Sequence, residues 1–213
     1  LPSHKTFFNW VDSTYNIYKE QQVRSNHYSG EMVLARHQKL VRDFMQNRSP
    51  MRGILLYHGL GSGKTCASVA IAETARSSRD VVFISPAKLE YNFRNDGLKK
   101  CGYDYYRIKK HWVFCKCETA IERELAANIG IPEHVIAKNH GMFLVDQHNR
   151  KSNYDKLGKL QENLDYQINA MINKRYTFLH YNDSHIVSKL GEYPFDKKIV
   201  IIDEVHNLVN AMV

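Results

Sequence analysis

Residues 53–65 read GILLYHGLGSGKT, and this stretch decides the fold that the sequence predicts. The apolar run over residues 53–57 is typical of a short buried strand. A glycine-rich turn follows at once, and the alanine-rich segment Lys64–Arg76 predicts a helix. A strand that passes through a glycine-rich turn into a helix is the context that a phosphate-binding loop requires.

Each part of this loop would have a role in holding a nucleotide. The alternative is an unrelated glycine-rich turn. Its glycines let backbone N–H groups point inward and cradle a phosphate, and the helix N-terminus adds partial positive charge. Lys64 would reach the β- and γ-phosphate oxygens, and the hydroxyl of Thr65 would coordinate Mg²⁺. His58 stands where the usual pattern has glycine, which we interpret as a variant of the loop. The candidate ATP-binding residues here are His58, Gly59, Leu60, Gly61, Ser62, Gly63, Lys64 and Thr65.

A second strand supplies the carboxylates that such a loop needs. Ile199–Ile202 is the clearest buried strand in the sequence, and Asp203 and Glu204 follow it directly. Asp203 would hold Mg²⁺, and Glu204 would polarise the attacking water as general base. These acids could also cap the next helix, a role that does not compete with the first. His206 would couple the nucleotide site to the rest of the protein.

The rest of the chain alternates predicted helices and strands. Apolar residues recur at helical spacing in Glu31–Gln46 and Asp155–Arg175, and a short helix is expected from about Phe7 to Gln22. Val81–Ile84 and Tyr176–Tyr181 have the composition of strands. Apolar strands separated by helices indicate an α/β fold, with a mainly parallel sheet covered on both faces.

The charge balance favours an anionic partner. Thirty Lys and Arg against twenty-two Asp and Glu give a net charge of +8, with eleven His. Basic and aromatic residues alternate between Lys99 and Lys116, as single-stranded nucleic acid would require. A solvated basic face over ordinary core aromatics is an equally weighted alternative. The candidate nucleic-acid contacts in this segment are Lys99, Lys100, Arg107, Lys109 and Lys110.

The composition also excludes several classes. With 43% apolar and 24% charged residues the chain is globular, and no apolar run reaches the ~18 residues of a membrane span. Four cysteines are too few to staple it, which favours a reduced, intracellular setting with Cys66 packed as a small apolar residue. A zinc site at Cys101, His111, Cys115 and Cys117 is a weak alternative because the spacing is irregular. Because the sequence opens with Leu1 and ends at Val213 within an apolar pattern, we expect a piece of a longer protein.

Residues 59–65 and 203–206 resemble motifs I and II of superfamily 2 helicases and translocases of the DExH type. Three weaker matches lie in the expected order. Gln38, in Arg36-His37-Gln38, resembles the upstream element that contacts adenine, and Tyr176–Asn182 resembles the strand before motif II. Val81–Pro86 resembles motif Ia, which makes Ser85 and Pro86 candidate contacts to the nucleic-acid backbone. Together these motifs are similar to helicase-like NTPases of large cytoplasmic DNA viruses, with poxvirus-type transcription-factor and termination NTPases the nearest group.

The resemblance implies a RecA-like lobe that uses ATP and Mg²⁺, with DNA or RNA as partner and no membrane. It divides the chain into an N-terminal helical segment, residues 1–50, and an ATP-binding lobe, residues 51–213, with an insert at about 99–172. It also implies a second RecA-like lobe in the same full-length chain, viral transcription or virion proteins as possible partners, and, for a viral protein, a place in the virion and host cytoplasm.

The function implied is that of an ATP-dependent helicase or translocase in viral transcription or genome handling. Motif III and the arginine fingers of a second lobe are not in these 213 residues, so we expect the isolated chain to bind nucleotide weakly and hydrolyse little ATP. The alternatives are another P-loop ATPase, such as a packaging motor, or a non-enzymatic nucleotide-binding assembly module.

Overall fold

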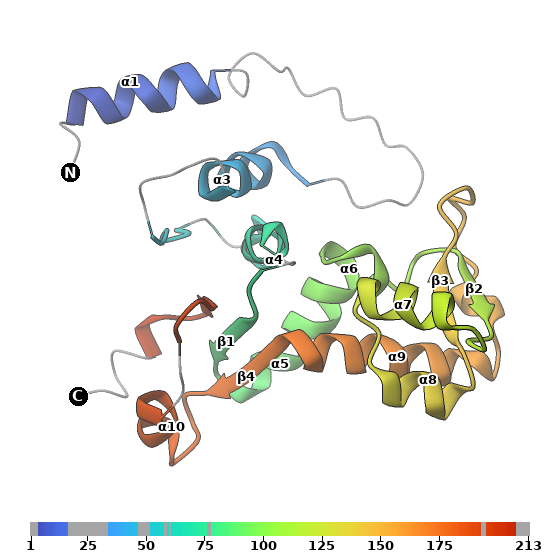
Figure 1. The fold of residues 1–213 in the computed structure, drawn as a ribbon. Coiled ribbons are helices and arrows are strands. Elements are labelled where there is room, and N and C mark those ends of the chain that lie inside the picture. The colour runs from blue at the N-terminus through green and yellow to red at the C-terminus, as the bar shows by residue number, and fades with distance from the viewer. Residues whose placement is uncertain are drawn as a thin grey trace.

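A three-stranded parallel sheet lies at the centre of the structure (Figure 1), in the order β4-β1-β5. This computed structural model describes residues 4–16, 34–46, 52–57, 59, 61–75, 78–192 and 195–207. The strands are β1 (Val81–Ser85), β4 (Tyr176–His180) and β5 (Ile199–Ile202). The predicted α/β class with a parallel sheet is therefore confirmed.

Strand β1 lies between the other two strands, and all five of its residues are buried. In the register of the sheet, Phe83 of β1 lies opposite Phe178 of β4 and Ile201 of β5. The ring of Phe83 also stacks on that of Phe93, with 3.8 Å between the centroids. The β-branched and aromatic composition of this strand suits a strand that pairs on both sides.

Helices and a small second sheet complete the fold. Strands β2 (Trp112–Cys115) and β3 (Met142–Val145) form an antiparallel pair, which lies at the far end of the molecule from β5 in Figure 1. The helices are α1 (His4–Tyr15), α3 (Arg36–Gln46), α4 (Lys64–Thr74), α5 (Ala87–Asn92), α6 (Lys99–Cys101), α7 (Ala120–Ile129), α8 (Glu133–Asn139), α9 (Leu160–Arg175) and α10 (Ile186–Glu192). A π-helical turn spans Phe93–Leu98, and 3-10 turns span Asp104–Tyr106 and Tyr154–Lys156.

Helix α9 joins the two sheets into one hydrophobic core. Its buried positions recur every three or four residues, at Leu164, Ile168, Met171 and Ile172. The buried amide of Gln167 donates to the carbonyl of Phe143 at 2.9 Å and accepts from the Phe143 N–H at 2.8 Å. This side chain thus satisfies both backbone groups of a β3 residue and fastens the second sheet to α9.

Several element boundaries differ from the predicted ones. The first helix ends at Tyr15, and residues 17–22 of the predicted segment lie outside the described residues. Helix α9 begins at Leu160 instead of Asp155, because Gly158 adopts a left-handed φ of 55° that interrupts the preceding turn. Helix α3 begins at Arg36, and residues 31–33 of its predicted range again lie outside the described part.

The predicted strand over residues 53–57 was wrong. These residues adopt no strand, and the side chains of Leu55 and Tyr57 are 74% and 92% exposed. Strand β5 is likewise not the fully buried strand expected, since Val200 and Ile202 are about two-fifths exposed. The physical reason is shared: β5 pairs with β1 alone among the described strands, and residues 53–57 pair with none of them, so neither segment is covered on both sides.

The cysteines also correct an expectation. The structure joins Cys66 of α4 to Cys101 of α6 in a disulfide, with Cα atoms 5.4 Å apart, so Cys66 is not a free apolar residue. The cause is the packing of α4 against α6, which brings together residues 35 positions apart in sequence. The bond also takes Cys101 out of the zinc alternative, and no group of three or more metal-ligating side chains occurs within the described ranges.

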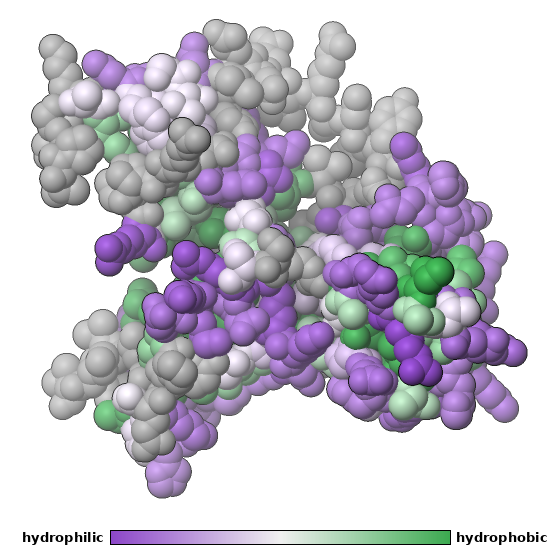
Figure 2. Space-filling model, in the orientation of Figure 1, coloured by the Kyte–Doolittle hydropathy of each residue, from purple (hydrophilic) through white to green (hydrophobic). Residues whose placement is uncertain are grey.

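Most of the described surface in Figure 2 is hydrophilic, and a hydrophobic patch lies over the region of α7 and β2. These two elements carry four exposed apolar side chains, Val113, Phe114, Ile121 and Leu125. Among the described helices none is both long and apolar enough to span a bilayer.

Candidate nucleotide site

The glycine-rich turn leads directly into α4, which begins at Lys64. Gly61 and Gly63 both have a φ of 76°, a left-handed conformation that favours glycine. The N–H of Ser62 donates to the carbonyl of Gly59 at 3.4 Å. His58 and Leu60, also predicted to bind ATP, lie outside the described residues.

The side chain of Lys64 folds back onto this turn. Its Nζ donates to the carbonyl oxygen of Gly59 at 3.2 Å, five residues earlier. The hydroxyl of Ser62 is buried and has no hydrogen-bond partner in the protein. A lysine and a buried hydroxyl without a partner in the protein, both at a glycine-rich turn, are groups that a phosphate can engage.

Helix α3 supports the turn from outside. The buried amide of Gln38 donates through Nε2 to the carbonyl of Gly63 at 3.0 Å, and its Oε1 accepts from the N–H of Ala35 at 2.8 Å. His37 Nε2 also lies 2.9 Å from the carbonyl oxygen of Ser62. Gln38, predicted to contact adenine, therefore has both polar atoms of its side chain engaged within the protein.

The acidic pair is placed by the sheet. Asp203 follows β5, and its N–H donates to the carbonyl of Ile84 in β1 at 2.9 Å. The hydroxyl of Tyr181, just beyond β4, donates to the carbonyl of Asp203 at 3.0 Å. The carboxylate of Asp203 accepts from the N–H of Glu204 at 3.1 Å. All three strands thus contribute to holding this turn.

The electrostatics of Asp203 link the two motifs. Burial raises the pKa of this carboxyl, and the adjacent charge of Glu204 raises it further. The N–H bond from Glu204 and the positive charge of Lys64 lower the pKa of Asp203, so Lys64 lies within electrostatic reach of it. The influence of Lys64 on the pKa of Asp203 is the electrostatic link between the two motifs.

Glu204 and His206 form a second part of the site. Glu204 has a left-handed φ of 51°, uncommon for a non-glycine residue, and its carboxylate is half-exposed. Its Oε2 lies 3.4 Å from Nδ1 of His206, which is exposed. The predicted general base is therefore open to solvent and paired with the predicted coupling residue.

Thr65 occupies the first turn of α4 beside a glycine. A Cβ added to Gly97, in the π-helical turn, would lie 2.8 Å from the methyl group of Thr65 and 3.5 Å from a methyl group of Val69. The absence of a side chain at Gly97 therefore sets how closely α4 packs against this turn.

The chemistry of these residues fits a nucleoside triphosphate with Mg²⁺. The turn carries a lysine and a buried hydroxyl that can engage phosphates, and Thr65 and Asp203 carry the oxygen atoms that would ligate the metal. Mg²⁺ requires no dedicated cluster, because it retains several waters and takes one or two carboxylates with substrate phosphates.

The candidate nucleic-acid contacts are less favourably placed. Ser85 is fully buried, and its hydroxyl donates to the carbonyl of Pro86 at 3.1 Å. Its side chain is therefore not exposed to a nucleic acid at the surface. Pro86 is half-buried at the start of α5.

The basic segment is partly neutralised. Asp104 lies 3.5 Å from Arg107 and 3.3 Å from Lys110, and Lys100 pairs with Asp96. Burial lowers the pKa of the Lys99 ammonium, and the charge of Asp165 partly opposes that shift. Lys109 is exposed.

The aromatic residues of this segment serve the core. Tyr106 and Trp112 are 1% and 2% exposed, and Tyr103 and Tyr105 pack against the same cluster. The structure thus favours core packing for these rings over base stacking. Sequence reasoning missed Tyr181 and Gly97 as supports of the site; the His-Tyr-Asn motif was the signal for the first, whereas nothing local marked the second.

The glycine-rich turn, the acids after β5 and the parallel sheet resemble those of helicase-like α/β proteins, and comparison with known proteins agrees. A protein of Acanthamoeba polyphaga mimivirus, "Putative ATP-dependent RNA helicase R563", is 23% identical over 208 residues, which cover 96% of this chain and 30% of that protein. A second from the same virus, "Putative ATP-dependent RNA helicase L377", is 27% identical over 93% of this chain and 17% of its own length. "Putative helicase 087L" of Invertebrate iridescent virus 3 is 27% identical over 66% of this chain.

These relatives confirm the resemblance to helicase-like proteins of large cytoplasmic DNA viruses. The chain spans at most 30% of the length of these relatives. No protein-family profile matches the chain, and no solved structure matches it.

Proposed function

We propose that this chain provides the ATP-binding lobe of a DExH-type motor that translocates along DNA or RNA or separates its strands. In the proposed division, residues 51–213 form the RecA-like lobe and residues 1–50 a helical segment that supports it. A second RecA-like lobe of the full-length protein and viral transcription or virion proteins are the proposed partners. Viral transcription or genome handling is the proposed setting.

The observation that supports this proposal is the electrostatic link between Lys64, at the start of α4, and Asp203, which the carbonyl of Ile84 holds at the end of β5. They belong to segments far apart in sequence, yet the charge of Lys64 acts on the carboxyl of Asp203. Lys64 follows the glycine-rich turn, and Asp203 follows β5 at the carboxyl end of the parallel sheet. Ligands of α/β proteins bind at this carboxyl end of the strands.

The residues of the chain would then act as follows. The N–H groups of the turn and Lys64 bind the phosphates, and Thr65 and Asp203 hold the metal. Bound Mg²⁺ would neutralise charge on the β- and γ-phosphate oxygens. Glu204, half-exposed beside His206, orients and deprotonates the attacking water. Gln38 holds the Gly63 carbonyl, which keeps the N–H groups of the turn in place.

The test is nucleotide binding, measured by the fluorescence of a methylanthraniloyl-ATP analogue with and without Mg²⁺. Lys64→Ala should weaken binding at least tenfold, because charge-assisted contacts contribute about 1.5–3 kcal/mol. Lys116→Ala removes an exposed lysine elsewhere and should leave binding unchanged. Equal binding by both variants would contradict the proposal.

Hydrolysis and strand-separation assays on the full-length protein distinguish the motor from the assembly module. In the full-length motor, Glu204→Gln should retain nucleotide binding and abolish nucleic-acid-stimulated hydrolysis and strand separation. Partner binding that persists in both the Lys64 and Glu204 variants, without stimulated hydrolysis in the wild type, would favour an assembly module.

A further inference from the structure

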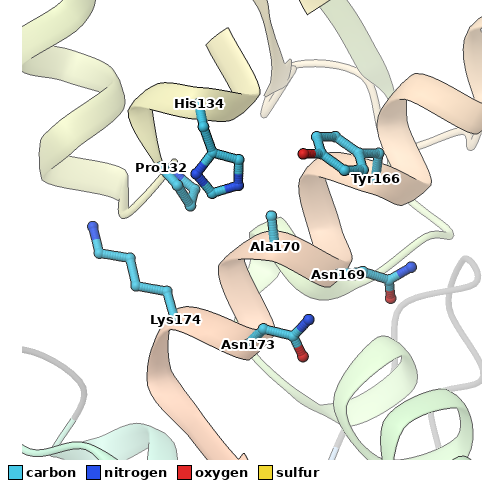
Figure 3. A pocket seen from close by; sticks show the side chains of 7 residues that line it. All are labelled: Pro132, His134, Tyr166, Asn169, Ala170, Asn173 and Lys174. Atoms are coloured by element: carbon cyan, nitrogen blue, oxygen red, sulfur yellow. The ribbon is translucent and has the colours of Figure 1, made fainter. Parts of the chain in front are cut away.

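A second cavity lies away from the nucleotide site, in the proposed insert. It has a volume of about 650 Å³ and opens between α8 and α9 (Figure 3). Its lining residues are Pro132, His134, Tyr166, Asn169, Ala170, Asn173 and Lys174. None of them belongs to the glycine-rich turn, to β5 or to the end of β1, and the proposed nucleotide chemistry uses none of them.

The groove is kept open by a small residue between two anchored helices. Ala170 forms its floor, below the rings of His134 and Tyr166 and beside the Lys174 side chain in Figure 3. The opposite flank of α9 is fixed in the core, and the amide of Asn139 in α8 donates to the carbonyl of Asn163 in α9 at 3.1 Å. Both walls are therefore held by contacts outside the groove.

The aromatic wall is preorganised. Lys138 Nζ lies 3.5 Å from the centroid of the Tyr166 ring, and the His134 ring meets that ring edge-on, with 6.2 Å between centroids. These contacts fix the orientation of a half-buried tyrosine beside positive charge. The Lys138 ammonium covers one face of the ring, so the opposite face is the one on which a base of a single strand would stack.

The polar lining offers donors and no carboxylate. Lys174 and His134 provide positive or donating groups, and Asn169 and Asn173 provide amides. The Oδ1 of Asn173 accepts from Nη1 of Arg94 at 2.8 Å, so its Nδ2 is the group that can donate to a ligand. The two acids of α9, Glu162 and Asp165, are not among the lining residues, and Asp165 accepts from the hydroxyl of Tyr154.

We propose that the groove between α8 and α9 binds single-stranded nucleic acid, with a base against Tyr166 and a backbone phosphate beside Lys174 and His134. The choice of ligand rests on the proposed function, whereas the groove itself does not. Stacking, amide contacts to base edges and cations for phosphate are the three elements that single-strand recognition combines.

The test is fluorescence anisotropy of a labelled single strand, about 12 nucleotides long, with the full chain and without ATP. Ala170→Glu places a carboxylate in the groove and should weaken binding about tenfold or more. Lys174→Ala should weaken binding and reduce the slope of log affinity against log salt by about one. Lys156→Ala removes an exposed lysine just before α9 and should bind as the wild type does.

A second measurement does not depend on how the variants fold. A strand carrying 4-thiouridine should crosslink to α8 or α9 in the wild-type chain, with Tyr166 among the crosslinked positions. Crosslinks confined to other elements, or wild-type affinity in both Ala170→Glu and Lys174→Ala, would overturn the proposal. Displacement of the strand by AMP at the same concentration of nucleotide units would identify a free-nucleotide site and also overturn it.

This outcome is independent of the proposed motor. Lys64→Ala should leave strand binding in the absence of ATP unchanged, whereas Ala170→Glu should leave binding of the ATP analogue unchanged. Unchanged binding of the ATP analogue by the Lys64 variant would contradict the proposed nucleotide site. Unchanged strand binding by the Ala170 variant would contradict the proposed groove.

Discussion

The side-chain amide of Gln38 donates to the backbone carbonyl of Gly63 at 3.0 Å, linking helix α3 to the last residue of the glycine-rich turn. A Cβ on Gly63 would lie 2.4 Å from Nε2 of Gln38, so this contact also requires glycine at position 63. The turn is therefore positioned by a residue 25 positions earlier in the chain, and not by its own sequence alone.

Replacing Gln38 tests this support. Gln38→Glu keeps the acceptor for the Ala35 N–H but places a carboxylate oxygen against the Gly63 carbonyl, so the two oxygens repel. We expect affinity for the ATP analogue to fall about tenfold, since an unsatisfied buried group costs about 1–3 kcal/mol. Gln46→Ala, at the exposed end of the same helix, is the control. Unchanged affinity in Gln38→Glu would show that the contact does not position the turn.

Gly97→Ala tests the packing of α4. The added Cβ would come within 2.8 Å of the Thr65 methyl group, so Thr65 or the π-helical turn has to shift. Overpacking of this kind costs about 1–3 kcal/mol, and we expect a lower melting temperature together with weaker Mg²⁺-dependent nucleotide binding. Gly191→Ala in α10 adds a methyl group where nothing lies within 4 Å, and should leave both quantities unchanged or slightly raise stability. Identical behaviour of the two variants would refute the role of Gly97.

Asp203→Asn should separate stability from function. Burial raises the pKa of Asp203, so the native state binds its proton more tightly than the unfolded chain does. The stability that this proton contributes is lost as pH rises from about 3.8 through the native pKa, and the ionised carboxyl is unfavourable above it. At neutral pH we therefore expect the asparagine variant to melt at a higher temperature and to lose Mg²⁺-dependent nucleotide binding.

The pH dependence is the check on this sign. The difference in melting temperature between Asp203→Asn and the wild type should shrink as the pH falls through the raised native pKa of Asp203, because the native carboxyl then becomes protonated. Asp196→Asn, at an exposed position, provides the matched control. A variant less stable than the wild type at neutral pH would contradict the prediction.

The disulfide predicts a thiol count. Under denaturing, non-reducing conditions two thiols, Cys115 and Cys117, should react with a maleimide, and four should react after reduction. Reduction should lower the melting temperature, because closing a loop between residues 35 positions apart stabilises a fold by between about 3 and 5 kcal/mol. Four reactive thiols before reduction would show that the bond does not form in solution.

The parts of the fold that depend on local pattern were predictable. Strand β1 and helix α4 lie where their apolar and alanine-rich patterns placed them, and Asp203 follows the strand that the apolar run over residues 199–202 predicts. The residues at 53–57 have an equally apolar pattern, but a strand forms only where a neighbouring strand pairs with it, which is a non-local property.

Other features of the site depend on packing that the sequence does not encode locally. Alternating basic and aromatic residues do not reveal which way a ring faces, and the structure turns Tyr106 and Trp112 inward. The bond between Cys66 and Cys101 and the contact of Gly97 with Thr65 both arise from how α4 packs against the segment after α5. The support from Gln38 likewise depends on the seating of α3 beside the turn.

Cys66 lies one residue after Thr65, and Cys101 is the last residue of α6. The covalent bond between them makes the first turn of α4 mechanically continuous with the segment that leads to Tyr106 and the second sheet. We therefore expect a displacement of Lys64 and Thr65 to be felt in that segment through the covalent bond.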